Sequence, residues 1–291
     1  MRASFVIVNY NRKDDLLLSL KKTKELIKSY ANSYEIIVVD NASIDGSPAA
    51  IRANFPDVIV IENPVNTGAP AWNLGFAVAK GDYFIIIDDD SHIEYGLEEA
   101  FDYMDEHQDV GVLALNITNG PYQTKDWGWK GNQELLGFFG CGAILRRETY
   151  NKVGGYADWM FLYVNEFEYG LRCIDKGYKV RYFENSSVNH RASAINRSSK
   201  RLRVQAAKNE MGIVYKHFTG NKFKYLFRMW VNNIKIIKYG KFKQAYYDTI
   251  GAIEFLKIRN KLVPTPVSKE AQEYFVEKYH NTHPIFKYVF D

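Results

Sequence analysis

An apolar run that ends in three acids is the most informative stretch of the sequence: Tyr83-Phe84-Ile85-Ile86-Ile87-Asp88-Asp89-Asp90. Its first five residues show no polar alternation, which is typical of a strand buried on both faces of a parallel sheet. Three similar runs precede it, at residues 4–8, 35–39 and 58–61. Helical spacing of apolar residues lies between the runs, as at residues 16–27. The alternation predicts an open α/β sheet flanked by helices.

Polar side chains follow each of the four runs, where the predicted strands end. They comprise Asn9 and Tyr10, then Asp40, then Asn66 and Asn73, and finally Asp88, Asp89 and Asp90. Ligands of open α/β sheets bind beyond the carboxyl ends of the strands, so we expect one binding site made from all four clusters. The first run is not followed by G-x-G-x-x-G, which argues against a dinucleotide-binding dehydrogenase and a nucleotidyltransferase.

The triplet Asp88-Asp89-Asp90 is the strongest indication of a metal site. Like charges crowded at a strand end raise one another's pKa unless a cation neutralises them. Carboxylate oxygens suit Mg²⁺ or Mn²⁺, ions that proteins commonly share with substrate phosphates. If the strand continued through the triplet, Asp88 and Asp90 would share one face and Asp89 would lie on the other. A solvated acidic turn that caps the next helix is the alternative interpretation.

A second motif, Asn165-Glu166-Phe167-Glu168, begins a predicted helix that ends near residues 176–177. Glu166 and Glu168 are about 200° apart around a helix, so they cannot both face one ligand. Glu168 and Arg172 are four residues apart and form a stabilising pair. Glu166 lies in the first turn, where the helix dipole favours its ionised form and hence a role as general base. Taken alone, both glutamates could equally serve only the helix N-terminus.

Weaker candidates come from a histidine and a group of aromatic residues. His190 follows a predicted strand at residues 178–183 and a short loop, where an imidazole can complete a metal site. Aromatic ring faces suit the apolar faces of sugar rings, although large aromatics equally fill cores. The aromatic group consists of Trp127, Trp129, Trp159 and Tyr163.

Length and charge predict how the chain is organised. Its 291 residues, 46% of them hydrophobic, suit one large domain with a smaller appendage. Residues 1–199 carry 20 Lys/Arg and 27 Asp/Glu, whereas residues 200–263 carry 15 and 3, so the net charge changes from −7 to +12. We therefore predict a boundary between a body at residues 1–199 and a basic, aromatic-rich helical region at residues 200–291.

Two features bear on location. The chain has only two cysteines, Cys141 and Cys173, which favours a reducing compartment over a disulfide framework. The N-terminus shows no basic leader or cleavage site, and the longest nearly apolar stretch, residues 135–145, is far shorter than the roughly 20 residues that span a membrane. We expect a cytoplasmic protein; the alternative is a peripheral position at the inner face of the membrane.

The basic segment at residues 200–263 has three interpretations. Its predicted helices, at residues 225–238 and 242–259, could pack on the rest of the chain or on a second copy, which is the interpretation we favour. Interleaved basic and aromatic residues could instead contact an anionic membrane surface. Nucleic acid binding fits the charge, but no motif supports it.

Taken together, these motifs resemble those of the family-two inverting glycosyltransferases of the A-type, nucleotide-sugar-binding fold. The resemblance covers residues 3–192 and includes the motif Gly140-Cys141-Gly142-Ala143. Bacterial rhamnosyltransferases and galactofuranosyltransferases are the branches that the chain looks most like. The resemblance implies an α/β fold with a mostly parallel central sheet flanked by helices, plus a C-terminal helical region.

The resemblance also implies roles for individual residues. Asp40 corresponds to the aspartate that hydrogen-bonds the nucleotide base, and Glu166 to the catalytic base. The other implied donor-binding residues are Asn9, Tyr10, Asn66, Asn73, Asp88 and Asp89. The implied ligands of Mn²⁺ or Mg²⁺ are Asp88, Asp90 and His190. The aromatic residues implied to face the acceptor are Trp127, Trp129, Trp159 and Tyr163.

These roles imply a metal-dependent transferase of cell-surface polysaccharide synthesis. It would move a sugar from a UDP- or dTDP-sugar to a hydroxyl group of a saccharide or lipid-linked glycan acceptor. A single displacement with Glu166 as base would invert the anomeric centre. Asn165-Glu166 departs from the two acids that relatives usually show at this point. A catalytically idle sugar-nucleotide-binding or scaffold subunit is therefore the alternative.

Overall fold

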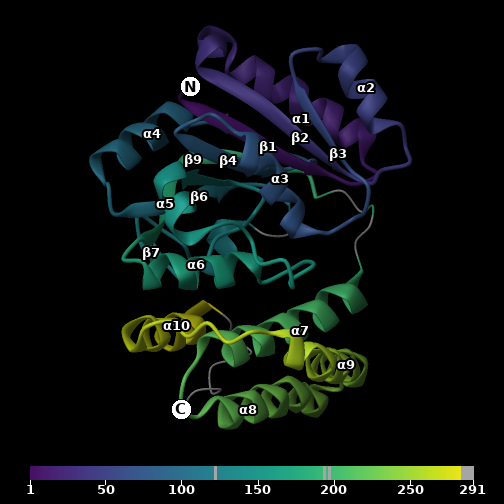
Figure 1. Ribbon diagram of the computed structural model, residues 1–291, viewed down its shortest axis with the longest axis vertical. Helices are drawn as coiled ribbons and strands as arrows, with labels where there is room; N and C mark the ends of the chain where they lie inside the picture. Colours follow the sequence, from purple (N-terminus) through teal and green to yellow (C-terminus); the bar gives the residue numbers. More distant parts are fainter. Residues whose placement is uncertain (121–122, 193–194, 196–197, 283–291) are drawn as a thin grey trace.

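The computed structural model describes residues 1–120, 123–192, 195 and 198–282. In these residues a nine-stranded mixed sheet has the order β3-β2-β1-β4-β8-β6-β9-β5, with β7 paired to β9 (Figure 1). The strands are β1 (Ala3–Asn9), β2 (Tyr34–Asn41), β3 (Ile59–Asn63), β4 (Tyr83–Asp88), β5 (Ser91–Tyr95), β6 (Val110–Ile117), β7 (Glu134–Leu135), β8 (Ala143–Arg146) and β9 (Lys179–His190).

The first half of the sheet is parallel, as the unbroken apolar runs predict. β1 pairs in parallel with both β2 and β4, and β2 pairs in parallel with β3. The predicted strands at residues 4–8, 35–39, 58–61 and 83–87 are thereby confirmed. Beyond β4 the sheet becomes mixed, because β8 runs antiparallel to both β4 and β6, while β6 and β9 are parallel. The sequence patterns did not predict β5, β6 or β8.

Helices cover both faces of the sheet and form a separate group below it (Figure 1). One buried core contains Leu16, Ile51 and Phe101, which come from α1, α2 and α4. The core on the other face contains Trp72 and Tyr169, which come from α3 and α6. The helices are α1 (Lys13–Leu26), α2 (Ser47–Asn54), α3 (Trp72–Val78), α4 (Leu97–Glu106), α5 (Arg147–Val153), α6 (Asn165–Asp175), α7 (Ser199–His217), α8 (Lys222–Ile234), α9 (Phe242–Ile258) and α10 (Lys269–Thr282).

The C-terminal helices α7 to α10 share a third core with α6. Leu171 of α6 belongs to the same buried cluster as Met211 of α7, Phe255 of α9 and Phe275 of α10. Packing of the basic segment on the rest of the chain is therefore confirmed for the buried faces of its helices. The boundary at residue 199 stays a prediction, because this core draws side chains from both sides of it.

A buried ionic cluster joins α6 to α7. Arg172 binds both carboxylate oxygens of Glu168, as the four-residue spacing predicts, and Nε2 of His217 lies 2.9 Å from Oε1 of Glu168. Nδ1 of His217 lies 2.9 Å from the carbonyl oxygen of Thr265. Both ring nitrogens of His217 thus face oxygen atoms of the chain. Glu168 therefore belongs to the contact between α6 and α7 rather than to a ligand site.

Across the described part of the chain, none of the helices combines the length and the apolar character that crossing a bilayer demands.

Candidate active site

The carboxyl ends of β1, β2 and β4 meet at one edge of the sheet. Asn9 is in register with Asp40, and Val8 with Asp88. The Asn9 side-chain amide donates to Oδ1 of Asp40 at 2.8 Å, and the backbone N–H of Ser43 donates to Oδ2 at 3.0 Å. Asp40 is only 2% exposed. These contacts fix the loops after β1 and β2 relative to each other. Asn9 and Asp40 themselves are not among the residues that line the cavity at this edge, so their contact with a donor stays a prediction.

Arg12 neutralises two of the three clustered aspartates. Its Nη1 lies 2.8 Å from Oδ1 of Asp89 and 3.3 Å from Oδ2 of Asp90, and Nη2 donates to the carbonyl oxygen of Ile195 at 2.7 Å. The expectation that Asp89 faces away from Asp90 is therefore wrong. β4 ends at Asp88, and the chain turns through Asp89 and Asp90, so strand alternation no longer applies.

The Asp89 carboxyl group in this turn has a raised pKa. Burial raises the pKa of Asp89 to about 7; the charges of Asp90 and Asp88 add to this rise, and Arg12 opposes it. The backbone N–H of Tyr10 also donates to Asp89, at 3.3 Å. The Asp89–Arg12 pair therefore holds the loop after β1 against the turn after β4. Asp88, which is only partly buried, is the member of the triplet at which β4 ends.

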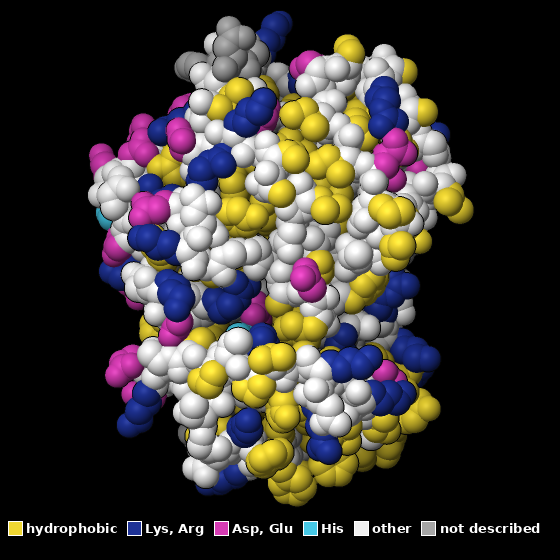
Figure 2. All heavy atoms as spheres, in the orientation of Figure 1, with side chains coloured by type: hydrophobic (Ala, Val, Ile, Leu, Met, Phe, Trp, Pro, Cys, Tyr) yellow, Lys and Arg dark blue, Asp and Glu magenta, His cyan; other side chains and the backbone are white. Residues whose placement is uncertain are grey.

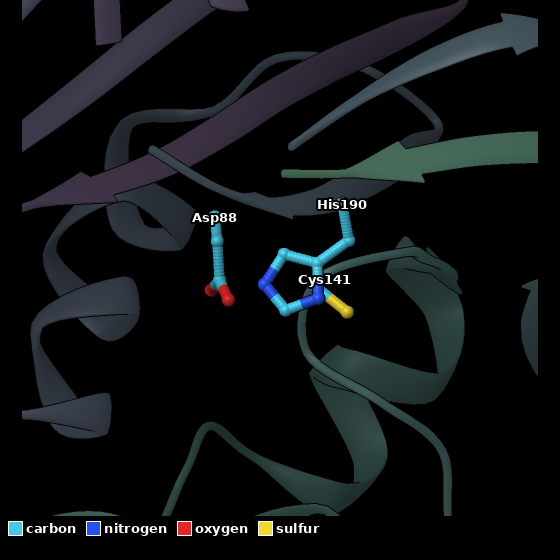
Figure 3. A group of neighbouring side chains, drawn as sticks. All are labelled: Asp88, Cys141 and His190. Atoms are coloured by element: carbon cyan, nitrogen blue, oxygen red, sulfur yellow. The ribbon is translucent and has the colours of Figure 1, made fainter. Parts of the chain in front are cut away.

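Asp88 and Cys141 lie next to the His190 ring, with the Asp88 carboxylate on one side of it in this view and the Cys141 sulfur on the other (Figure 3). One ligand atom from each of these residues lies within 4.8 Å of the other two. Nε2 of His190 also lies 3.2 Å from Oδ1 of Asp90. A carboxylate, an imidazole and a thiol in such proximity are a donor set that fits a divalent ion. The residues Asp88, Asp90 and His190, expected to be metal ligands, are thus neighbours here.

Glu166 lies in the first turn of α6, next to the loop that carries Cys141. Its Oε1 accepts a hydrogen bond from the backbone N–H of Gly140 at 3.2 Å. Burial raises the pKa of Glu166 to about 7, with the charge of Asp88 contributing to the rise and the backbone hydrogen bonds opposing it. A carboxylate with a pKa near neutrality is suited to accept and release a proton.

The backbone before Glu166 is held in a conformation that side chains rarely adopt. Tyr163 and Val164 have φ angles of 68° and 65°, so two successive non-glycine residues lie in the left-handed region. The side-chain amide of Asn209, in α7, donates to the carbonyl oxygens of Leu162 and Tyr163 at 2.9 Å and 2.8 Å. Such strain persists only where the surroundings enforce it, and it is concentrated at functional sites.

A cavity of about 190 Å³ opens among these elements. Four residues expected to bind the donor line it, namely Tyr10, Asn66, Asp88 and Asp89, as does Tyr163 from the expected acceptor group. The remaining lining residues are Val8, Arg12, Asn41, Gly68, Trp72, Phe161, Leu162 and Arg201.

Several expected site residues lie apart from this cavity. Asn73 exchanges hydrogen bonds with the backbone of Tyr156, at 2.9 Å and 2.8 Å. Trp129 is 7% exposed and stacks on Phe139 with ring centroids 4.8 Å apart, and Trp127 meets the same ring edge-on. Trp159 packs over Gly212, where a Cβ atom would lie 2.4 Å from its ring. Contact of these tryptophans with an acceptor stays a prediction.

The sequence analysis missed three residues of the site. Cys141 stood in a quoted motif without a role, and Arg12, two residues after Tyr10, was not considered, although a cation beside clustered carboxylates is the partner that their charge requires. Arg201 lines the cavity from the first turn of α7, far away along the chain. The packing of α7 against α6 and the segment before it brings this guanidinium to the site, and no local sequence pattern indicates it.

Comparisons with known proteins agree with this geometry. The family model described as glycosyl transferase family 2 matches residues 4–168. The poly(ribitol-phosphate) beta-glucosyltransferase of Bacillus spizizenii is 32% identical over 133 residues. This match covers 41% of the present chain but only 20% of that enzyme, so the chain spans a small part of the length of this relative.

Solved structures share the fold across nearly the whole chain. The mannosyltransferase PcManGT from Pyrobaculum calidifontis, in complex with GDP-Man and Mn²⁺, has a TM-score of 0.60 and 18% identity, covering 99% of this chain and 81% of that one. S. aureus TarS 1–349 in complex with UDP-GlcNAc has a TM-score of 0.60 and 14% identity, covering 96% and 89%. At such low identity these likenesses establish the fold alone, an A-type glycosyltransferase fold.

Proposed function

Because the chain belongs to glycosyl transferase family 2, we propose that it moves a sugar from a UDP- or dTDP-sugar to a hydroxyl group of a saccharide or lipid-linked acceptor, with inversion at the anomeric carbon. The observation that carries the proposal is the position of Glu166. A partly buried carboxylate whose pKa is raised to about 7 stands at the helix N-terminus beside Asp88, close to the cavity.

The donor would occupy the cavity that Tyr10, Asn66 and Asp88 line. Arg12 and Arg201 also line it, so the cavity offers two guanidinium groups to a diphosphate. Asp88 and His190 would hold a divalent ion, Mn²⁺ or Mg²⁺, with Asp90 against the imidazole. When bound, such an ion supplies positive charge to the departing diphosphate. The Mn²⁺ in the mannosyltransferase complex supports this assignment.

Glu166 would act on the acceptor. Its carboxylate takes the proton of the acceptor hydroxyl while that oxygen forms a bond to the anomeric carbon, and the bond from this carbon to the diphosphate oxygen breaks. A single displacement inverts the configuration at the anomeric carbon. The hydrogen bond from Gly140 orients one carboxylate oxygen, which leaves the other for the proton.

Asn165, the residue on which the catalytically idle alternative depends, has a structural role of its own. Asn165 stands where related enzymes usually carry an acid, but its side chain is 2% exposed and donates a hydrogen bond to the carbonyl oxygen of Met160 at 3.1 Å. An ionised acid could not donate there. Asn165 therefore serves the bend that leads into α6, while Glu166 keeps the carboxylate at the site.

The acceptor is proposed to be a cell-envelope polymer or its lipid-linked precursor, and the name of the Bacillus glucosyltransferase supports this.

An apolar groove of about 360 Å³ lies among α7, α8 and α9. Figure 2 shows hydrophobic side chains gathered over α8 and α9, with Lys and Arg around them. Phe223 and Phe227 are 66% and 63% exposed there. Exposed aromatics within a basic surface suit contact with an anionic membrane.

Nucleotide binding tests the donor assignment. UDP, dTDP, GDP and ADP are titrated by calorimetry with and without Mn²⁺, using the wild-type chain and Asp88→Asn. Binding of UDP or dTDP that depends on Mn²⁺ and weakens in Asp88→Asn supports the proposal. Failure of all four nucleotides to bind would contradict it and would favour a scaffold role.

A further inference from the structure

We propose that Cys141 is a ligand of the ion at this site, which makes the centre an Asp–Cys–His site that prefers thiophilic ions to Mg²⁺. The inference rests on the proposed function, because it concerns the ion that Asp88 and His190 would hold. It goes beyond that function by assigning a third ligand and a metal preference to the chain.

The sheet brings the three residues together from distant parts of the sequence. β8 runs antiparallel to β4 with Ala143 opposite Ile86, so continuing the register by two residues places Cys141 level with Asp88. His190 ends β9, where it is paired with Ser91, three residues after Asp88. Strand pairing thus brings the ends of β4, β8 and β9 together, and the turns at Asp89–Asp90 and Cys141 complete the approach of the three side chains.

The spacing of the donor atoms fits a single ion. All three lie within 4.8 Å of one another. Bonds from a zinc-like ion to oxygen, nitrogen and sulfur measure about 2.0 to 2.3 Å, so two ligand atoms of a tetrahedral site lie roughly 3.3 to 3.8 Å apart. The three donor atoms would therefore have to move closer together when an ion binds. The side chains of Cys141 and His190 are 5% and 2% exposed, so little solvent competes for these positions.

The two cysteines of the chain have different surroundings, which provides a matched control. Both cysteines belong to buried apolar clusters, but only Cys141 has a carboxylate and an imidazole, those of Asp88 and His190, within reach of its sulfur. A buried thiol with apolar neighbours behaves as a small hydrophobic residue. A thiol beside a carboxylate and an imidazole completes a set that selects Zn²⁺ or Co²⁺ over Mg²⁺, an ion that prefers six oxygen ligands.

Cobalt spectroscopy tests the proposal without donor or acceptor. Co²⁺ is added to the full chain, and the near-ultraviolet charge-transfer band of a cobalt–thiolate bond is recorded for wild type, Cys141→Ser and Cys173→Ala. We expect the band in wild type and Cys173→Ala and its loss in Cys141→Ser. A band that persists in Cys141→Ser, or Co²⁺ bound to wild type without a band, overturns the proposal.

Metal affinity gives a second readout that is independent of the spectrum. Cys141→Ser should weaken Cd²⁺ binding by about tenfold or more while changing Mg²⁺ binding by less than about threefold. Equal losses for both ions would overturn the thiolate assignment, and circular dichroism checks that the variant is folded. Sugar transfer is measured separately. Transfer activity in a protein that shows no cobalt–thiolate band contradicts only this inference. A cobalt–thiolate band in a protein without transfer activity contradicts only the proposed function.

Discussion

The backbone N–H of Gly140 donates a hydrogen bond to Oε1 of Glu166, with the two atoms 3.2 Å apart. This contact joins the first turn of α6 to the loop that carries Cys141, so the proposed base and the proposed metal site are held by adjacent residues. A Cβ atom at position 140 would lie 2.8 Å from the same oxygen, closer than real Cβ contacts. Glycine therefore lets the loop approach the carboxylate.

Gly140→Ala should displace the Glu166 carboxylate and lower the rate of sugar transfer by about tenfold, because small misplacements of a catalytic group are costly. Donor affinity should stay near the wild-type value, since Gly140 does not line the cavity. In a Glu166→Gln background the same substitution should have little further effect. Additive losses in the double variant would show that Gly140 acts through something other than Glu166.

The raised pKa of Glu166 predicts opposite effects of pH on activity and stability. The base must be ionised, so the rate should rise as the pH passes through about 7. The pKa lies above the ordinary value of 4.5, so the folded chain holds a proton that the unfolded chain releases. The contribution of Glu166 to stability therefore falls as the pH rises from about 4.5 to about 7.

Chemical denaturation checks the stability half of this prediction. Glu166→Gln should be more stable than wild type at pH 8, by roughly 1 to 2 kcal/mol, and no more stable at pH 4.5. If the difference in unfolding free energy between Glu166→Gln and wild type is the same at both pH values, burial of Glu166 does not perturb its ionisation.

Arg12→Met should destabilise the fold by about 3 kcal/mol at pH 9, well above the pKa of about 7 of the Asp89 carboxyl group, because it leaves Asp89 and Asp90 without their cation. The side chains of these aspartates are 6% and 0% exposed. Adding Asp89→Asn to Arg12→Met should recover part of the loss, since one of the uncompensated charges is then absent. Thermal unfolding of the wild type and of the single and double variants measures this coupling. A double variant no more stable than Arg12→Met would contradict the assigned pairing.

Membrane contact through α8 predicts that Phe223→Ser with Phe227→Ser reduces retention on anionic liposomes at low salt by at least about fivefold. Both side chains are mostly exposed, so the fold should be unaffected. Ile44→Ser, at an apolar position in the loop after β2 that is 93% exposed, serves as the control. If the wild-type chain is not retained on such liposomes, the membrane proposal falls, and the groove becomes a candidate contact between two copies.

The fold was largely predictable because its signals are local. Each strand of the parallel half is a continuous apolar run, and the polar residues at the strand ends follow from the rule that sites form there. The later strands β6 and β8 were not predicted. β8 has only four residues, Ala143–Arg146, and emerges from a longer apolar stretch, so neither length nor alternation distinguishes it from the preceding loop.

The site was predictable only in part, for a different reason. Glu166, Asp88 and His190 could be named because each stands at a strand end or helix start. The pairing of Arg12 with Asp89 and Asp90 depends on a turn after β4, and strand alternation gave the wrong face for Asp89. Arg201 reaches the cavity only through long-range packing of α7, which local patterns do not encode.

The most direct test of the account is sugar transfer by wild type and Glu166→Gln, followed by NMR of the anomeric proton. The assay supplies UDP- and dTDP-sugars, Mn²⁺ and a saccharide acceptor. The account predicts release of the nucleoside diphosphate and an inverted product with wild type. It also predicts a rate at least about 100-fold lower with Glu166→Gln, at unchanged donor affinity. A retained anomeric configuration, or near wild-type turnover by Glu166→Gln, would contradict it.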